Sequence, residues 1–332
     1  MKVVIPLAGF GTRLRPHTFT KPKPLVNVAG KPVLAHILDP LMDLDVEEMV
    51  FIVGHLGEQI RDYVSSHYQV PAQYVEQREL KGQAHALHLA REHLTGPLLI
   101  IFVDTIFEAD LSHLPTDCDG IFYVKDVEDP RRFGIAILDE EQRFVTRVVE
   151  KPADPVSNLA VIGAYYIRDG ERLRDAVDEL LRRDIKTKGE YYLADALQLM
   201  IDGGAKFISV TVDVWEDCGK PEAVLQTNRY LLTKTGGRVG GSRDSIIVPP
   251  VYIADSAKVE HSVIGPYVTI AEGAVVRHSI IKDSIINAGA CIEDAMLNLS
   301  IIGDNAHVRG SYDQLNVGDS SLVDATGHGY EE

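Results

Sequence analysis

The chain opens with an apolar run that ends in a glycine-rich turn, VVIPLAGFGTRLRP (residues 3–16). The start of this run is almost continuously apolar, as is typical of a parallel strand buried on both faces of a sheet. Further apolar runs and helix-period segments alternate after it, the runs at 49–53, 74–75 and 98–103 and the segments at 32–44, 58–67 and 83–93. Strands and helices in this order predict a doubly wound α/β sheet.

The alternation becomes mixed after residue 103. We expect a small group of antiparallel strands over 120–127, 135–138 and 145–149, followed by a strand that returns to the sheet at 161–167. Three helices are expected after it, over 171–183, 191–201 and 221–233. Residues 1–236 therefore predict a Rossmann-like doubly wound mixed sheet. Ligands bind such sheets at the carboxyl ends of strands, so the loops after Ala8, Val103 and Val149 are the places to look for chemistry.

A different rhythm begins after Gly236. Aliphatic residues recur in steps of six with several fives, from Ile247 to Val308, and residues 241–332 contain no Phe or Trp. A period near six indicates a parallel β-helix, whose narrow interior has no room for large rings. The alternative is a loose β-sandwich with accidental spacing. We expect a hexapeptide-repeat domain over 237–332.

Composition excludes several classes of protein. The 332 residues carry a formal net charge of −16, so the chain is not built to coat nucleic acid or an anionic membrane. No apolar stretch approaches the ~18 residues of a membrane span. The three separated cysteines, Cys118, Cys218 and Cys291, fit a reduced compartment and hence a cytoplasmic protein.

The first loop carries cations in an otherwise acidic chain. Its turn, Ala8-Gly9-Phe10-Gly11-Thr12, lets backbone N–H groups converge on an anion, and Arg13 follows directly. Lys21, Lys23 and Lys31 then stand where a dinucleotide-binding fold would place an acid, and no P-loop pattern is present. This loop suits a triphosphate whose pyrophosphate leaves. The alternative is a solvated basic loop.

Carboxylates and one more lysine end other predicted strands. Asp104 follows the run at 98–103, and Asp217 precedes a helix; two such carboxylates suit a Mg²⁺ ion bound to phosphates, although Asp217 could equally be a turn residue. Glu150 and Lys151 stand before Pro152. There the carboxylate suits sugar hydroxyls, and the ammonium suits a sugar phosphate.

Together these motifs resemble the sugar-1-phosphate nucleotidylyltransferases. The resemblance rests on six segments that occur in the family's order: Gly9 to Pro16, Pro22 to Leu25, Gly82 to Ala84, Glu150 to Pro152, Gly163 to Tyr165 and Trp215 to Gly219. The family's usual G-D-N is replaced by Val103-Asp104-Thr105, which keeps the metal ligand but changes its neighbours.

The resemblance implies a role for each motif. Arg13 and Lys23 would hold the triphosphate, and the nucleotide would also contact Ala8, Gly9, Gly11, Thr12, Gln77 and Gly82. Gly134, Glu150, Lys151 and Gly163 would bind the sugar phosphate, and Asp104 and Asp217 would bind Mg²⁺. The implied partners are a nucleoside triphosphate and a sugar 1-phosphate.

The tail also resembles long-form glucose-1-phosphate thymidylyltransferases, which carry a left-handed β-helix. This favours transfer from dTTP to glucose 1-phosphate, giving dTDP-glucose. Transfer from UTP is the alternative. Two other readings stay open. The β-helix could transfer acyl groups with bases among His261, His278, His307 and His328, or the chain could be a non-catalytic nucleotide-sugar sensor. We also expect a homo-oligomer, because a β-helix exposes flat faces and an open final coil.

Overall fold

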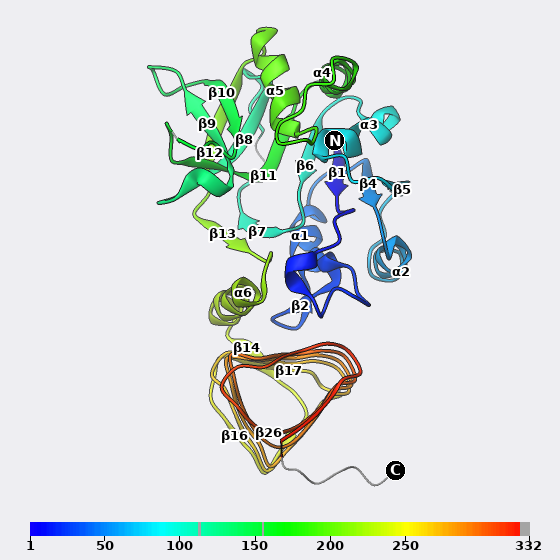
Figure 1. The fold of residues 1–332 in the computed structure, drawn as a ribbon, viewed down its shortest axis with the longest axis vertical. Coiled ribbons are helices and arrows are strands. Elements are labelled where there is room, and N and C mark those ends of the chain that lie inside the picture. The colour runs from blue at the N-terminus through cyan, green and yellow to red at the C-terminus, as the bar shows by residue number, and fades with distance from the viewer. Residues whose placement is uncertain (112–113, 155, 326–332) are drawn as a thin grey trace. The chain divides into compact units, whose positions relative to one another are not determined.

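The computed structural model describes residues 1–111, 114–154 and 156–325. It divides the chain into two compact units that do not follow chain order (Figure 1). Unit 1 comprises Met1–Gly9 and Ile37–Trp215, and unit 2 comprises Phe10–His36 and Glu216–Glu332. The glycine- and cation-rich loop thus falls in the same unit as the C-terminal strands, a grouping that a division along the chain at residue 236 does not reveal.

Nine strands form the main sheet among the described residues of unit 1. They are β1 (Lys2–Pro6), β4 (Glu48–Val53), β5 (Ala72–Glu76), β6 (Leu98–Ile101), β8 (Gly120–Asp126), β9 (Gly134–Leu138), β10 (Val145–Glu150), β11 (Leu159–Ile167) and β12 (Phe207–Thr211). The order is β10-β9-β11-β6-β1-β4-β5, and β8 pairs with both β11 and β12. The predicted mixed α/β sheet is confirmed, but β8 extends the main sheet instead of leaving it.

The centre of this sheet is parallel and buried. β1 lies between β4 and β6, and Val3, Val4 and Ile5 have no exposed surface. After β1 the chain forms β4 on one side of β1, and it later forms β6 on the other side. The connections from β1 to β4 and from β5 to β6 therefore run in opposite directions from a point between β1 and β6. That divergence marks the crevice where open α/β sheets bind ligands. Ala8 follows the end of β1, and Asp104 follows the end of β6, which pairs with β1 in parallel.

Helices cover the sheet of unit 1. They are α2 (Gly57–His67), α3 (Gln83–Leu89), α4 (Gly170–Arg182) and α5 (Leu193–Asp202), with 3-10 turns η3 (Asp39–Leu41), η4 (Arg91–His93) and η5 (Pro130–Arg132). The helix expected over 32–44 is shorter: α1 ends at Leu38, and η3 follows because Pro40 lacks the N–H that an α-helix needs. A two-stranded sheet of β7 (Thr105–Glu108) and β13 (Val214–Asp217) was not expected.

Unit 2 combines one helix with an early loop. Helix α6 (Pro221–Thr235) has proline at its first position and ends at Gly236 in the left-handed conformation. We call residues 10–36 the signature loop. It contains the 3-10 turns η1 (Thr12–Leu14) and η2 (Lys23–Leu25), the hairpin of β2 (Asn27–Val28) and β3 (Lys31–Pro32), and the start of α1 (Val33–Leu38).

The remainder of unit 2 is a parallel β-helix, which confirms the hexapeptide rhythm. One face is β14 (Gly237–Val239), β17 (Val251–Ile253), β20 (Val268–Ile270), β23 (Ile285–Ile286), β25 (Ile301–Ile302) and β27 (Asn316–Val317). The others comprise β15 (Ser242–Arg243), β16 (Ile246–Ile247), β18 (Lys258–Glu260), β19 (Val263–Ile264), β21 (Val275–Arg277), β22 (Ile280–Lys282), β24 (Cys291–Asn298), β26 (His307–Tyr312) and β28 (Leu322–Asp324). Strands of successive coils pair in parallel, and their aliphatic side chains fill the interior.

Polar ladders run along the coils outside this apolar interior. Buried serines at one corner accept backbone N–H groups from the next coil, as when Ser262 Oγ accepts from Ser279 at 3.1 Å. On an outward column, Arg277 lies between Glu260 and Glu293, at 3.2 and 3.1 Å. Alternating signs avoid like charges on adjacent strands. Arg277 and Arg309 thus pair with Glu260, Glu293 and Asp294 along the stack.

Neighbouring isoleucines in β22 test the β-helix interior. Ile281 is fully buried, whereas Ile280 on the same strand is 48% exposed. We expect Ile281→Ala to lower the free energy of unfolding by about 2–5 kcal/mol through the cavity it leaves, and Ile280→Ala to change it by less than ~0.5 kcal/mol. Urea titration followed by circular dichroism measures both. Equal losses for the two variants would contradict the described orientation.

Candidate functional site

The predicted base-contacting residues meet in unit 1. Gln77 is buried after β5, and its Nε2 donates to the carbonyl of Gly82 at 3.2 Å and lies 3.2 Å from His85 Nδ1. Gly82 has a φ of 111°, and a Cβ there would lie 2.4 Å from the carbonyl oxygen of Tyr191. Only glycine fits this position, so the turn presents Gln77 in one orientation.

The predicted backbone contact after β1 is open to a ligand. A Cβ built on Gly9 would meet no heavy atom within 4 Å. Its neighbour Ala8 is buried, two residues after the end of β1. The backbone at Gly9 is therefore accessible without displacement of a side chain.

The predicted sugar-phosphate residues form one cluster in unit 1. Glu150 and Gly134 are cross-strand partners, and a Cβ on Gly134 would lie 3.0 Å from Glu150 Oε2. Lys151 Nζ lies 3.3 Å from Glu150 Oε1. Burial raises the pKa of Glu150, and Lys151 opposes this rise. The cluster thus holds a partly desolvated carboxylate beside an ammonium group.

Sequence reasoning missed two residues that contact Lys151 and a third, Asp195, that acts on Glu150. Lys151 Nζ contacts Tyr192 Oη at 3.3 Å and lies over that ring, and Lys188 Nζ donates to the Lys151 carbonyl at 3.0 Å. Burial opposes the charge on Lys151, but Glu150 and Tyr192 outweigh it and raise its pKa. Asp195 has a buried Oδ2 without a hydrogen-bond partner, and its charge raises the pKa of Glu150. The one sequence signal they share is that they lie close together in the chain, at or just before the start of α5.

Asp104 and Gly163 flank the same cluster. Burial raises the pKa of Tyr165, and the carboxylates of Glu150 and Asp104 add to the rise, which places all three near one another. Gly163, with a φ of 83°, accepts the N–H of Phe102 at 2.9 Å. The replacement Thr105 is used structurally: its hydroxyl donates to the carbonyl of Ile162 at 3.2 Å.

Arg13 and Asp217 come together in unit 2. A Cβ on Gly219 would lie 2.7 Å from Asp217 Oδ1 and 3.1 Å from Arg13 Nη2, so both side chains crowd this glycine. Asp217 Oδ1 also accepts the Gly219 N–H at 2.6 Å. The structure thus joins residues far apart in sequence, the first motif and the last, into one charged group.

The turn before Arg13 packs against the predicted lysine. Gly11 has a φ of 61°, and a Cβ there would lie 3.0 Å from Lys23 Cβ. The Thr18 hydroxyl donates to the Gly11 carbonyl at 2.8 Å. Thr12 begins η1 directly after this turn. Gly11, Thr12, Arg13 and Lys23 therefore belong to one folded segment.

Two other cations of the signature loop have protein partners. Lys21 Nζ lies 2.6 Å from Asp304 Oδ2 in the β-helix, and the Arg15 guanidinium lies over the Phe19 ring at 4.8 Å. Lys21 is therefore paired with a carboxylate of the protein.

A Mg²⁺ ion would need help from a substrate. Asp104 and Asp217 offer the hard oxygen ligands that Mg²⁺ uses with phosphates. Within the described residues, no three His, Cys, Asp or Glu side chains are grouped to hold a metal. One or two carboxylates completed by phosphate oxygens and water match the usual Mg²⁺ coordination, so the residues fit the ion.

Two of the β-helix histidines lie next to each other. The His261 and His278 rings stack at 5.4 Å between centroids with an interplanar angle of 6°, one coil apart. Their use as acyl-transfer bases stays a prediction, and His328 lies outside the described residues.

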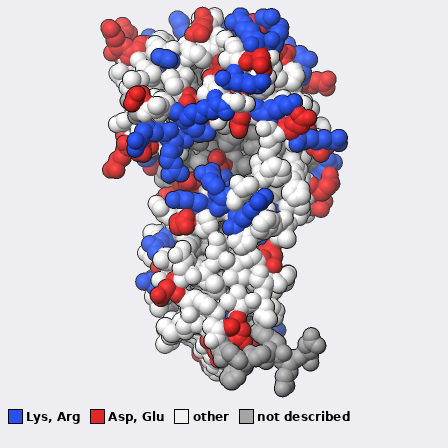
Figure 2. All heavy atoms as spheres, in the orientation of Figure 1, with Lys and Arg blue, Asp and Glu red and all other residues white. Residues whose placement is uncertain are grey.

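Surface charge differs between the parts. On the face drawn in Figure 2, Lys and Arg are frequent over unit 1, whereas the β-helix shows mainly uncharged atoms. No helix in the described ranges has the length and apolarity to cross a membrane.

The family follows from the sequence profile that matches the chain. The Nucleotidyl transferase profile matches residues 2–234. The chain belongs to this family. The matched range contains all the residues placed above except those of the β-helix.

Curated relatives cover different parts of the chain. A UTP–glucose-1-phosphate uridylyltransferase, AglF of Haloferax volcanii, is 35% identical over 71% of the chain and 98% of its own length. A glucose-1-phosphate thymidylyltransferase of Streptomyces antibioticus is 31% identical over 94% of the chain and 85% of its own length. The bifunctional protein GlmU of Methanocaldococcus jannaschii is 34% identical over 75% of the chain, but only 58% of its own length is matched.

Solved structures share the fold. A UDP-glucose pyrophosphorylase complexed with UDP-glucose superposes with a TM-score of 0.62 at 24% identity, over 70% of this chain and 98% of that chain. At this identity the likeness shows the nucleotidyltransferase fold alone.

The buried carboxyl of Glu150 gives a pH prediction. Because its pKa is raised, folding favours its protonated form, so its contribution to stability is fully present below the ordinary Glu pKa and is lost as pH rises through the raised value. As pH rises from the ordinary Glu pKa through the raised pKa of Glu150, we expect the free energy of unfolding to fall less in Glu150→Gln than in wild type. The exposed Glu128→Gln is the control. Parallel pH profiles for wild type and Glu150→Gln would contradict the assignment.

Proposed function

We propose that the chain transfers a nucleotidyl group from a nucleoside triphosphate to a sugar 1-phosphate and releases pyrophosphate. The observation that carries the proposal is the Arg13–Asp217 group around Gly219, which pairs a phosphate-binding cation with a metal-binding carboxylate. The Glu150–Lys151 pair supplies the complementary chemistry for a phosphorylated sugar. Neither group alone would define a transferase.

The reaction is a single in-line displacement. An oxygen of the sugar phosphate attacks the α-phosphorus of the triphosphate, and the bond from that phosphorus to the bridging oxygen breaks, so pyrophosphate leaves with the bonding electrons. Positioning and charge neutralisation carry such a step, and no side-chain nucleophile is needed. Arg13 and Lys23 would stabilise the leaving pyrophosphate, and Lys151 would hold the attacking phosphate.

Mg²⁺ is the proposed cofactor, held by Asp104 and Asp217. When bound, it would neutralise charge on the triphosphate and on the developing leaving group. In this acidic chain the ion, Arg13 and Lys23 would together offset the charge of two phosphorylated substrates.

The proposed substrates are dTTP and glucose 1-phosphate, with UTP as the alternative. The thymidylyltransferase relative spans 94% of the chain, including the β-helix region, whereas the uridylyltransferase relative spans 71%. A Gln77 amide can pair with the edge of a pyrimidine, but it does not distinguish a methyl group from hydrogen. The homo-oligomeric state and the cytoplasmic location stay predictions.

A substrate panel tests the proposed function. Pyrophosphate release is measured with each of dTTP, UTP, ATP, CTP and GTP combined with a set of sugar 1-phosphates, with and without Mg²⁺. We expect the fastest release with dTTP and glucose 1-phosphate, and loss of release when EDTA removes the metal. Release in no combination would overturn catalysis and favour a nucleotide-sugar sensor.

Asp217 gives a sharper test of the metal assignment. Asp217→Asn keeps the Oδ1 acceptor for the Gly219 N–H, so the turn should fold, but it removes the metal-binding charge. We expect turnover to fall by about 100-fold or more, with an unchanged melting temperature. The exposed Asp213→Asn is the matched control. Near-normal turnover in Asp217→Asn would remove this residue from the metal site.

A further inference from the structure

The signature loop has little structure of its own. Apart from two short 3-10 turns and a hairpin of two-residue strands, it is irregular until α1 begins. A long segment of this kind holds one conformation only when outside contacts fix it. Those contacts are made with α6 and the β-helix, in the same compact unit.

One anchor lies near the hairpin and centres on a buried amide. Asn228 of α6 has no exposed surface, and its Oδ1 accepts the Ala29 N–H at 2.9 Å and the Thr269 hydroxyl at 2.6 Å. Its Nδ2 donates to the carbonyl of Tyr267 at 3.2 Å. Asn228 thus ties the loop, α6 and β20 together through three hydrogen bonds.

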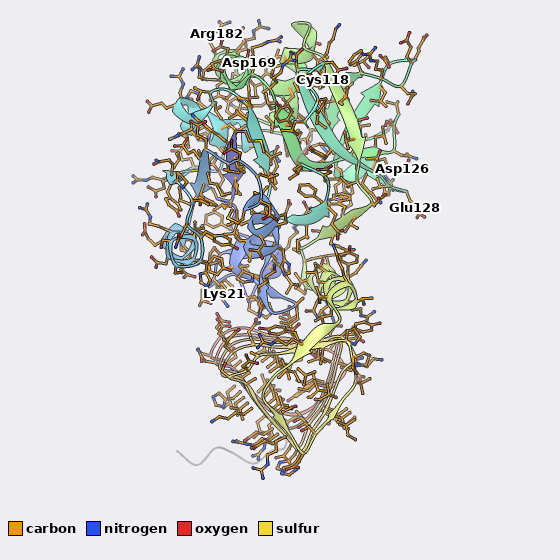
Figure 3. All side chains as sticks on the ribbon, turned by 180° about the vertical axis from the view of Figure 1, so that it is seen from behind. Lys21, Cys118, Asp126, Glu128, Asp169 and Arg182 are labelled. Carbon is orange, nitrogen blue, oxygen red and sulfur yellow. The ribbon has the colours of Figure 1, made fainter. Side chains whose placement is uncertain are left out.

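A second anchor lies between the two predicted catalytic cations. His17, Thr20 and Lys21 contact Asn316, Asp319 and Asp304 respectively, all in the last coils of the β-helix. Figure 3 shows Lys21 on the loop, on the side toward the β-helix. Each contact joins a short loop segment to residues almost 300 positions later.

The β-helix side of this anchor is itself organised. Asp319 accepts the loop hydroxyl of Thr20 with Oδ2, and with Oδ1 it accepts the backbone N–H of Asp304 at 2.7 Å. A Cβ on Gly318 would lie 3.0 Å from Pro16 Cβ, so the coil and the loop are closely packed. Asp304 and Asp319 therefore present their carboxylates from linked positions on adjacent coils.

The loop side of the anchor is buried. His17 is 5% exposed, and its Nδ1 has no partner, so Nε2 carries the hydrogen donated to Asn316 Oδ1. Burial lowers the pKa of His17, with the Asn316 contact opposing, which keeps the ring neutral at neutral pH. Loss of the Asn316 acceptor would leave a buried N–H unsatisfied.

We infer that Asp304, Asn316 and Asp319 are positioning residues, which act through the signature loop on binding of the triphosphate. The inference rests on the proposed function, in which Arg13 and Lys23 on either side of the anchor bind that substrate. A loop fixed in advance loses less conformational freedom when the ligand binds. The candidate sugar-phosphate residues belong to unit 1, whereas the anchor belongs to unit 2.

This role predicts a selective kinetic effect. A merely structural contribution would lower stability or affect both substrates alike. Release of the loop should instead weaken binding of the triphosphate in the forward reaction and binding of pyrophosphate in the reverse reaction. The KM for the sugar 1-phosphate should stay unchanged.

The experiment compares Asp304→Asn and Asn316→Ala with wild type in the full chain. Asp313→Asn, an exposed carboxylate of the same β-helix end, is the matched control. Hydrogen exchange without substrate should show amides 11–26 exchanging about tenfold faster in the two variants, while amides of β17, β20 and β23 stay protected. The KM for the triphosphate should rise about tenfold. The double variant Lys21→Asp/Asp304→Lys, which exchanges the two charges of the ion pair, should recover most of the amide protection that Asp304→Asn loses and return the triphosphate KM most of the way to the wild-type value.

Two results would overturn the inference. Unchanged exchange of residues 11–26 would show that the anchor does not hold the loop. Equal increases in both KM values, or faster exchange throughout the β-helix, would show a general structural role instead. If no substrate pair reacts, the proposed function fails, but hydrogen exchange still tests the anchor, so the two failures are distinguishable.

Discussion

The attachment of the signature loop to the β-helix is the constraint on which the proposed chemistry depends. Arg13 and Lys23 lie on a glycine- and proline-rich segment whose internal backbone hydrogen bonds are mostly those of short turns. Fixed cations stabilise a leaving pyrophosphate better than mobile ones, because no reorganisation is needed during the reaction. The β-helix supplies the rigidity that the loop lacks: parallel pairing sets each coil on the previous one, and the last coils carry the partners of Lys21 and His17.

Charge balance follows from the same arrangement. Residues 241–332 carry an excess of acid, with 5 Lys and Arg against 13 Asp and Glu. In the structure, part of it pairs along the coils through Arg277, and Asp304 neutralises Lys21. Among the loop cations, Lys21 thus holds the loop, and Arg13 and Lys23 are the ones proposed to bind a phosphorylated ligand. The acidic chain concentrates its phosphate-binding charge in a few places and does not spread it over a surface.

Sequence periodicity predicted the parallel core and the β-helix because both depend on local repetition. Runs such as Val3 to Ile5 and ladders such as Val259, Val276 and Ile292 are visible without long-range knowledge. Family motifs assigned Arg13 and Asp217 to the triphosphate and the metal, but their close approach at Gly219 was not predicted. Asn228, His17 and Tyr192 were missed, since their importance comes from partners distant in sequence. Pro40 was visible, but the apolar pattern around it hid the end of α1.

In the proposed reaction, a single displacement occurs at the α-phosphorus while both substrates are bound, and no covalent enzyme intermediate forms. Exchange of labelled pyrophosphate into the nucleoside triphosphate tests it most directly, with and without sugar 1-phosphate. A nucleotidyl group attached to a side chain would permit exchange when the sugar phosphate is absent. We predict exchange only when sugar 1-phosphate or the nucleotide-sugar product is present. Exchange with the triphosphate, Mg²⁺ and enzyme alone would contradict the account.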